Sequence, residues 1–363
     1  MTGSPLPEGL FATPVSTYLD TASYGIAPIA TIQAIREALR SWSVGEAKWF
    51  VDWDPVGEDC RRLIASIVGV DTASVALVPA VSVGVSIVAS GFDRGAEVLV
   101  ADDEFNSVLL PLTAAARERG INLRRVPFHR LADELSPATA LVAVSHVRSN
   151  GGGTLDVGTL VEAARRCSAA VLLDATHSAG VRVVDADRLG IDFVVGAAYK
   201  HLLCPRGASF LTVSEPWRER LVPRSASWRA QADPYAPGYG GDLDVLAATA
   251  ARFDVSLDWH AWVGARTSLR LLDAIPTPTR QAYCVGLTTA FAEGLGIPPT
   301  GSTVVGVPYT GDRATVTQRL DEEKIRVTVG EETLRVSFHL YNDETDVERG
   351  LDAIRPLLSA PAT

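Results

Sequence analysis

The chain has 363 residues, 47% apolar and 21% charged, a length and composition that fit a globular protein with one large and one smaller domain. Its formal net charge is −10 and it has no basic run, which argues against binding to nucleic acid or to an anionic membrane. No apolar stretch reaches the roughly 18 residues of a membrane span, and the first ten residues lack the pattern of a signal peptide, so we expect a cytoplasmic protein.

The N-terminal part of the chain combines irregular and helical segments. Residues 1–17 are expected to form an irregular arm, and residues 18–25 a short strand that breaks into a turn. Apolar residues at helical spacing predict a helix over 29–43. An aromatic patch overlaps the end of this helix: Trp42, Trp49, Phe50 and Trp53. We expect the patch to pack in the core, and the alternative is an aromatic lining for a bulky substrate.

The next segment predicts an anion-binding turn. A helix over 58–68 leads to a strand over 74–78 and then to small residues at 79–86, which open another helix. Free N–H groups and the positive end of the helix dipole would point to the same place there, as an anion requires. Two later strands, over 97–101 and 140–145, also run into polar or glycine-rich turns.

Two buried-looking strands between residues 170 and 196 end in polar groups. The first delivers Asp174, with His177 one turn further on, and the second delivers Tyr199 and Lys200. A parallel sheet presents such groups at its carboxyl edge, where open α/β sheets bind ligands. Taken singly, Asp174 could be a helix N-cap and Lys200 a surface lysine.

Together, these groups are what pyridoxal 5′-phosphate requires. This cofactor needs a lysine amine for a Schiff base and an acidic partner for its pyridine nitrogen. A carboxylate beside that nitrogen favours the protonated ring, which withdraws electrons from the substrate Cα so that a bond there can break. We therefore assign Lys200 to the Schiff base and Asp174 to the ring nitrogen.

The C-terminal third has the pattern of a smaller domain. Residues 227–241, rich in Trp, Tyr, Pro and Gly, are expected to form a long surface loop. From residue 258 the predicted order is helix, helix, strand, helix, strand, strand, helix. On the last strand, over 334–340, Arg335 carries a planar fork that suits a carboxylate. We assign Arg335 to the α-carboxylate of a substrate.

Three motifs carry a resemblance to a known family: DATHSAG at 174–180, KHLLCPRG at 200–207 and LRVSFHLYN at 334–342. With them, the chain resembles the class V aminotransferase family of fold-type I pyridoxal phosphate enzymes, which includes cysteine desulfurases, isopenicillin N epimerase-like proteins and kynureninase. The resemblance extends over nearly the whole chain. It implies an α/β fold in which a mainly parallel seven-stranded sheet carries helices on both faces, beside a smaller α/β C-terminal domain.

The resemblance also implies a domain division and a quaternary state. Residues 18–255 would form the large cofactor-binding domain, and residues 1–17 and 256–363 the small domain with its N-terminal arm. The protein would be a homodimer with the active site at the interface. Its partners would otherwise be small amino-acid-type substrates, with no role for nucleic acid or membrane.

Further site residues follow from the resemblance. The turn that begins at Ser82 would bind the phosphate, Phe105 would stack on the pyridine ring, and Asn150, or alternatively Ser149, would contact the phenolic oxygen or the substrate carboxylate. The implied catalytic residues are Lys200, Asp174 and His177. The implied cofactor contacts are Ser82, the N–H groups of Val83 and Gly84, Phe105, Asn150, Asp174, His177, Tyr199 and Lys200. The implied substrate contacts are Arg335, Ser23 and Tyr24.

Fold and cofactor do not fix the reaction. We expect transamination or β-elimination, such as C–S cleavage, on an α-amino acid or an amino-acid conjugate, in small-molecule biosynthesis. The alternatives are epimerisation, decarboxylation and a non-catalytic binding module. The cysteines Cys60, Cys167, Cys204 and Cys284 lack metal-ligand spacing, so no metal site is expected. Residues 311–333 contain no cysteine of the kind that carries a desulfurase persulfide, which argues against desulfurase activity.

Overall fold

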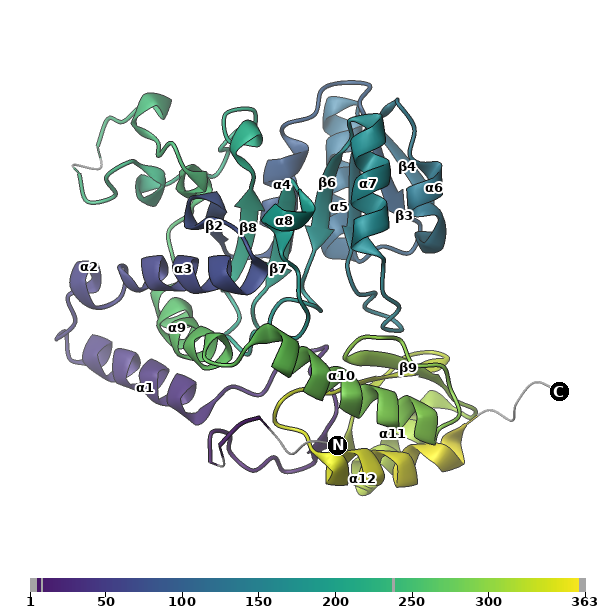
Figure 1. Cartoon of the computed structure of the whole chain (residues 1–363). Coiled ribbons are helices and arrows are strands. Elements are labelled where there is room, and N and C mark those ends of the chain that lie inside the picture. The colour runs from purple at the N-terminus through teal and green to yellow at the C-terminus, as the bar shows by residue number, and fades with distance from the viewer. Residues whose placement is uncertain (1–4, 8, 237–238, 359–363) are drawn as a thin grey trace.

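The computed structural model describes residues 5–7, 9–236 and 239–358, which form a larger and a smaller unit (Figure 1). A seven-stranded sheet forms the centre of the larger unit. The strand order is β2-β8-β7-β6-β5-β3-β4, and only β8 runs antiparallel to its neighbours. The bounds are β2 Val75–Val78, β3 Glu97–Ala101, β4 Asn122–Val126, β5 Thr139–Ser145, β6 Ala170–Asp174, β7 Phe193–Ala197 and β8 Ser209–Val213. The predicted mainly parallel sheet is confirmed.

Helices cover both faces of this sheet, because alternate side chains of a strand point to opposite sides. On β6, Leu172 packs with α4 and α5, whereas Val171 and Leu173 pack in the core that holds α3, α7 and α9. The helices of this unit are α1 Ile29–Ser43, α2 Trp49–Asp52, α3 Val56–Val68, α4 Val81–Ala89, α5 Asn106–Arg119, α6 Leu131–Glu134, α7 Val157–Cys167, α8 Ala186–Leu189 and α9 Trp259–Asp273.

The smaller unit is a three-stranded antiparallel sheet of order β11-β12-β9, with its helices on the outside (Figure 1). Its elements are α10 Thr277–Gly294, β9 Val304–Pro308, α11 Arg313–Glu322, β10 Ile325–Arg326, β11 Thr328–Val329, β12 Thr333–Ser337 and α12 Glu344–Ile354. The predicted strand over 334–340 ends early, at Ser337, where the chain turns towards the larger unit.

The chain crosses the proposed boundary between the units at two places. Strand β1, Thr17–Tyr18, pairs in parallel with β10, so the start of the expected large domain lies on the small unit. In the other direction, α9 belongs to the segment expected in the small domain but packs against α1 and α3 of the larger unit. These two exchanges join the two units at two separate places.

The predicted packing of the aromatic patch is wrong for most of its members. Trp53 is buried, but Trp42 and Phe50 are 62% and 52% exposed. The reason is that their packing partners are few: the Trp42 ring lies 5.3 Å from that of His260 on α9, and Phe50 lies on α2, a four-residue helix with no buried residue. The patch therefore contributes an apolar surface as well as core.

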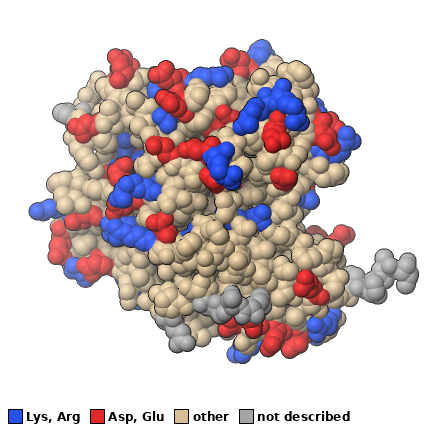
Figure 2. Space-filling view, viewed as in Figure 1, with Lys and Arg blue, Asp and Glu red and all other residues tan. Residues whose placement is uncertain are grey.

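The molecular surface agrees with the even charge pattern of the sequence. Figure 2 shows acidic and basic side chains interspersed over one face, without a continuous basic patch. Within the described ranges, no helix is both long and apolar enough to cross a bilayer. The same residues hold no cluster of His, Cys, Asp and Glu arranged to bind a metal ion.

Candidate active site

A cavity of about 200 Å³ lies at the carboxyl edge of the large sheet and contains Lys200. The sheet register brings Ser145 at the end of β5 beside Asp174 at the end of β6, and the loop after β7 brings Lys200 to the same edge. The cavity lining is Pro79, Ala80, Val81, Ser82, Phe105, Ser107, Ser145, Ser149, Asp174, Thr176, His177, Ala197, Tyr199, Lys200, Arg206 and Ser209. The order of the strands in the sheet thus brings together residues that are up to 130 positions apart in the sequence, from Pro79 to Ser209.

The environment of Lys200 favours a reactive amine. Its side chain is buried, its Nζ lies 3.2 Å from Nε2 of His177, and the amine is 5.3 Å from the ring centroid of Phe105. Burial, and after it the charge of Arg335, lower the pKa of Lys200 to about 8, against the opposing charge of Asp174. A neutral amine is the nucleophilic form, so this shift makes Lys200 suited to covalent catalysis.

Asp174 and His177 complete the inner wall. Oδ1 of Asp174 accepts the N–H of Thr176 at 2.8 Å, and burial raises the pKa of the Asp174 carboxyl. Burial also lowers the pKa of His177 well below its usual value, so its imidazole is neutral, and its buried Nδ1 has no hydrogen-bond partner. A carboxylate destabilised by burial gains most from a cationic ligand group. The donor set therefore fits a lysine-linked cofactor with a protonated ring nitrogen.

The proposed phosphate turn meets the cavity, but with different N–H groups from those expected. The N–H groups of Val83 and Gly84 already bond to the Ala80 carbonyl, at 3.1 and 3.4 Å. Ala80 is the N-cap of α4, so Val81 and Ser82 are the first helical residues and their N–H groups have no carbonyl in a preceding turn. Both line the cavity, whereas Val83 and Gly84 do not.

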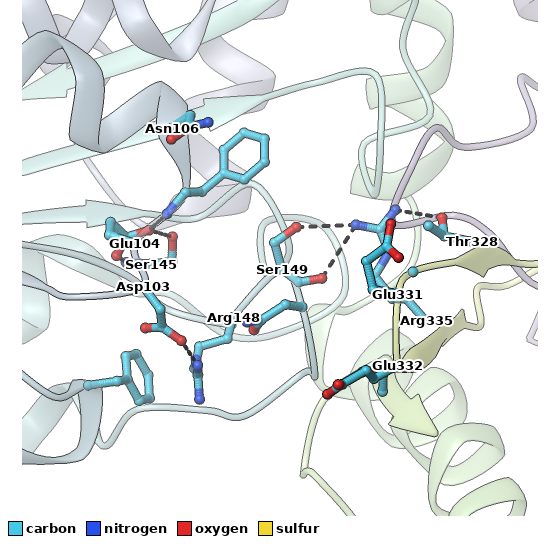
Figure 3. A pocket seen from close by; sticks show the side chains of 15 residues that line it. Asp103, Glu104, Asn106, Ser145, Arg148, Ser149, Thr328, Glu331, Glu332 and Arg335 are labelled. Carbon is cyan, nitrogen blue, oxygen red and sulfur yellow. Dashed lines mark hydrogen bonds and ion pairs between the residues drawn. The ribbon is translucent and has the colours of Figure 1, made fainter. Parts of the chain in front are cut away.

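A second cavity, of about 570 Å³, adjoins the first and shares Phe105, Ser145 and Ser149 with it (Figure 3). Arg335 lies at its far wall, on β12 of the smaller unit. Figure 3 shows its guanidinium directed at Ser149 and Thr328. The hydrogen bonds run to Ser149 Oγ at 3.2 Å, Ser23 Oγ at 2.6 Å and Thr328 Oγ1 at 3.0 Å.

Two expected contacts fall elsewhere. Tyr24 lines neither cavity: its ring lies 5.4 Å from that of Tyr18, whose hydroxyl donates to the Tyr24 carbonyl at 2.7 Å. Asn150 is exposed and lines only the outer cavity, whereas Ser149 lines both. The alternative counted forward from the end of β5, Ser149, is therefore the residue that faces Lys200.

Glu104 is a site residue that the sequence reading missed. Its buried carboxylate accepts the Phe105 N–H at 2.7 Å, the Ser145 hydroxyl at 2.5 Å and the Ser145 N–H at 2.8 Å (Figure 3). Burial raises its pKa, and these hydrogen bonds oppose the rise. The carboxylate fixes the ring of Phe105 relative to β5. The signal in the sequence was the acidic residue directly before Phe105, three positions after the end of β3.

A layer of buried histidines under the lysine was also missed. His201 shares a hydrogen bond of 2.9 Å with Oγ1 of Thr303, and Nε2 of His339 donates to the His201 carbonyl at 2.9 Å. Burial lowers the pKa of both imidazoles, to about 4 for His339. His201 follows Lys200 directly, whereas Thr303 and His339 come from the smaller unit. No local pattern reveals a contact between residues so far apart in the sequence.

Comparison with known proteins gives one consistent family. Residues 17–349 match the family model described as aminotransferase class-V. The isopenicillin N epimerase of Streptomyces clavuligerus is 26% identical over 332 residues, covering 82% of this chain and 83% of that protein. The kynureninase of Deinococcus radiodurans is 28% identical, covering 76% and 74%. A probable cysteine desulfurase of Aeropyrum pernix is 29% identical, covering 57% and 54%.

Solved structures show the same fold. The complex of the cystine C–S lyase C-DES with cysteine persulfide has a TM-score of 0.85 at 22% identity, and the match covers 95% of this chain and 98% of that one. The cysteine desulfurase from Thermococcus onnurineus has a TM-score of 0.81 at 22% identity, covering 94% of both chains. At these identities the likeness establishes the fold alone.

These comparisons correct one expectation and establish the family. The missing cysteine in residues 311–333 does not count against desulfurase activity, because probable cysteine desulfurases stand among the relatives. A reactive thiol need not have a fixed place in the chain. The family match covers nearly the whole sequence and includes both motifs around Asp174 and Lys200. The chain therefore belongs to the class V aminotransferase family and is a pyridoxal-phosphate-dependent enzyme.

Proposed function

We propose that the enzyme acts at Cα or Cβ of an α-amino acid or an amino-acid conjugate, by transamination or by β-elimination. The observation that carries this proposal is the position of Lys200: a buried amine with a lowered pKa, in one cavity with Asp174 and His177, which opens into a larger cavity walled by Arg335. The outer cavity of about 570 Å³ has room for a side chain larger than that of cysteine.

Each group then has one task. Arg335, held by hydroxyls from Ser23, Ser149 and Thr328, binds the α-carboxylate of the substrate and so orients Cα. Bound pyridoxal phosphate supplies an electron-withdrawing ring that weakens the bonds at Cα. Asp174, as a buried carboxylate, stabilises positive charge on the ring nitrogen. Phe105, which lines the cavity 5.3 Å from the Lys200 amine, would cover one face of the bound ring and keep water away from it.

Lys200 also serves as the acid–base group. With the cofactor and substrate bound, the freed amine would remove the proton from Cα, because a pKa of about 8 leaves part of it neutral near pH 7. The same amine would return that proton in transamination, whereas in elimination a group would leave from Cβ. His177, neutral and 3.2 Å away, keeps the amine in position without competing for its proton.

One experiment separates the two reactions. The enzyme is incubated with a cysteine S-conjugate, and pyruvate, ammonia and thiol are assayed in the absence and presence of a keto acid. Elimination gives all three products without a keto acid, whereas transamination needs the keto acid and releases no thiol. The chain has three lysines, of which Lys48 and Lys324 are exposed, so Lys324→Ala is a matched control for Lys200→Ala. Activity and colour that survive in Lys200→Ala would reject the proposal.

Epimerisation is a second candidate. Two isopenicillin N epimerases, from Streptomyces clavuligerus and Amycolatopsis lactamdurans, are 26% and 29% identical, each match covering 82% of this chain. Loss of optical rotation of an amino acid, with deuterium from solvent entering at Cα and no pyruvate formed, would favour this reaction over the first two.

We further propose a homodimer. Apolar side chains are exposed on two neighbouring segments, α1–α2 and the described residues of 228–236 and 239–245, which meet where the rings of Trp49 and Trp228 are 5.5 Å apart. The exposed members are Trp42, Val44, Trp49, Phe50, Val51, Tyr235, Leu243 and Val245. Such an apolar surface is typical of an interface. Sedimentation of Phe50→Glu should show a monomer, whereas Leu110→Glu, an exposed leucine on α5, should leave the dimer intact.

A further inference from the structure

The cavity around Lys200 needs positive charge to balance the cofactor phosphate, and Asp174 and His177 do not supply it. The phosphate of the cofactor carries between about one and a half and two negative charges at neutral pH. Among the described lining residues, the side chains that carry positive charge are Lys200 and Arg206, since His177 is neutral. Lys200 is used for the covalent link to the cofactor. Arg206 is then the cation that is left.

The position of Arg206 is fixed by an aromatic ring. Its guanidinium carbon lies 5.1 Å from the centroid of Tyr199, which also lines the cavity. A cation over a tyrosine ring is attracted to the negative face of the ring, which restricts an otherwise flexible side chain. Arg206 is exposed, and among the described residues no carboxylate forms an ion pair with its guanidinium. Its charge is therefore available to a ligand.

The donors beside the α4 turn are neutral. They are the hydroxyls of Ser82 and Ser209, which line the same cavity as Arg206, and the first N–H groups of α4, and Ser209 pairs with Val78 directly before that turn. Hydrogen bonds from these groups orient a phosphate, but they do not balance its charge, and a guanidinium binds phosphate oxygens in a bidentate manner. The charge of Arg206 is also felt by Lys200, whose pKa it lowers, so the two side chains share one electrostatic environment.

We propose that Arg206, held over Tyr199, binds the phosphate of the cofactor and supplies the positive charge that makes the site selective for pyridoxal phosphate over pyridoxal. This inference rests on the proposed function, with Lys200 linked to the cofactor, and on the expected phosphate turn at the start of α4, which lines the same cavity. It adds a specific cation and a measurable consequence, which is discrimination between two ligands that differ only in the phosphate.

The test measures dissociation constants of the apoprotein for pyridoxal phosphate and for pyridoxal, from the visible absorption band of the lysine-linked ligand. Arg206→Gln should bind pyridoxal phosphate about tenfold to a hundredfold more weakly, as expected for loss of a charge-assisted hydrogen bond, and should bind pyridoxal as the wild type does. Arg206→Lys, which keeps the charge but not the fork, should fall between the two.

Arg220→Gln is the matched control. Arg220 also lies over an aromatic ring, 3.8 Å from the centroid of Trp217, and it lines neither cavity. It should leave both dissociation constants unchanged. The inference would be overturned if Arg206→Gln weakened binding of both ligands equally, or if it weakened binding of neither. If binding of neither ligand weakened but KM for the substrate rose, Arg206 would be assigned to the substrate instead. A wild-type protein that gives no visible band with either ligand would reject the proposed function itself.

Discussion

Nζ of Lys200 lies 3.2 Å from Nε2 of His177, whose imidazole is neutral. Burial lowers the pKa of the amine to about 8 and that of the imidazole well below its normal range. The contact is therefore a hydrogen bond between a weakly basic amine and a neutral ring, and not a repulsive pair of cations. This arrangement prepares the amine for attack on a carbonyl.

The first prediction concerns the pH dependence of cofactor uptake. The neutral amine reacts, so the rate at which apoprotein combines with pyridoxal phosphate should rise with pH and level off above a midpoint of about 8, well below the value of 10.5 for an ordinary lysine. Arg335→Gln removes a charge that lowers this pKa, so the midpoint should move to higher pH. Stopped-flow absorbance across pH 6–11 checks both. A midpoint at the ordinary value would contradict the inferred environment of Lys200.

The second prediction concerns Asp174. In Asp174→Asn the ring nitrogen of the bound cofactor loses its carboxylate partner, so its pKa should fall by about 1–3 units and the reaction at Cα should slow strongly. Asp174→Glu keeps the charge and should retain more activity. Titration of the cofactor spectrum measures the ring pKa directly, apart from turnover. If the ring pKa stayed unchanged in the asparagine variant, Asp174 would not be the partner of the nitrogen.

How much could be predicted from the sequence depended on the kind of contact. Asp174, His177 and Lys200 follow neighbouring parallel strands, so a local pattern was enough to place them together. The turn after Asp20 brings the Tyr24 ring to 5.4 Å from that of Tyr18, outside the linings of both cavities, and no local pattern shows this. Which N–H groups of the phosphate turn are free depends on the residue at which α4 begins, and the sequence does not fix that start to within one or two positions.

Contacts between the units could not be read from the sequence. Thr303 and His339 reach His201 only because the small sheet packs on the carboxyl edge of the large one. Similarly, the pairing of β1 with β10 joins residues about 300 positions apart, and two-residue strands carry too little periodicity to predict a partner. Long-range packing therefore supplied the support under the lysine, whereas local motifs supplied the chemistry.

The third prediction concerns Arg335. Because a hydrogen bond to a charged group contributes about 1.5–3 kcal/mol, Arg335→Gln should raise KM for an α-amino acid about tenfold to a hundredfold. Binding of an amine that lacks the carboxylate should be unaffected, which separates lost recognition from damage to the fold. Arg326→Gln, at an exposed arginine on β10, is the control. An equal loss with both ligands would argue against a carboxylate-binding role.

The fourth prediction concerns Glu104. Its carboxylate accepts three hydrogen bonds, and in Glu104→Gln an amide NH₂ group replaces one oxygen and meets a donor. This variant should lose about 1–3 kcal/mol of unfolding free energy and hold the Phe105 ring less firmly, which shifts the visible band of the bound cofactor. Asp103→Asn, which breaks the more exposed pair with Arg148, should cost about 0–1 kcal/mol. Urea unfolding and absorption spectra give the two readouts, and equal losses in both variants would refute the anchoring role.

The last prediction concerns the buried arginine that anchors the segment 228–245. Arg229 forms ion pairs with Asp54 and with Glu58, the latter at 2.6 Å, and Asp54 also accepts the Tyr235 hydroxyl and the Trp259 indole N–H, each at 3.0 Å. Because Arg229→Ala leaves the Asp54 carboxylate buried without its cation, the free energy of unfolding should fall by about 3–5 kcal/mol.

The double variant Asp54→Asn/Arg229→Ala should recover part of this loss, since it removes the stranded charge as well. Arg224→Ala, at an exposed position four residues before this segment, should change stability by about 0.5 kcal/mol or less. Urea unfolding at one fixed protein concentration measures all three, so that subunit association does not alter the comparison. A double variant no more stable than Arg229→Ala would show that the guanidinium acts through packing, and that the charge of Asp54 is compensated by its other partners.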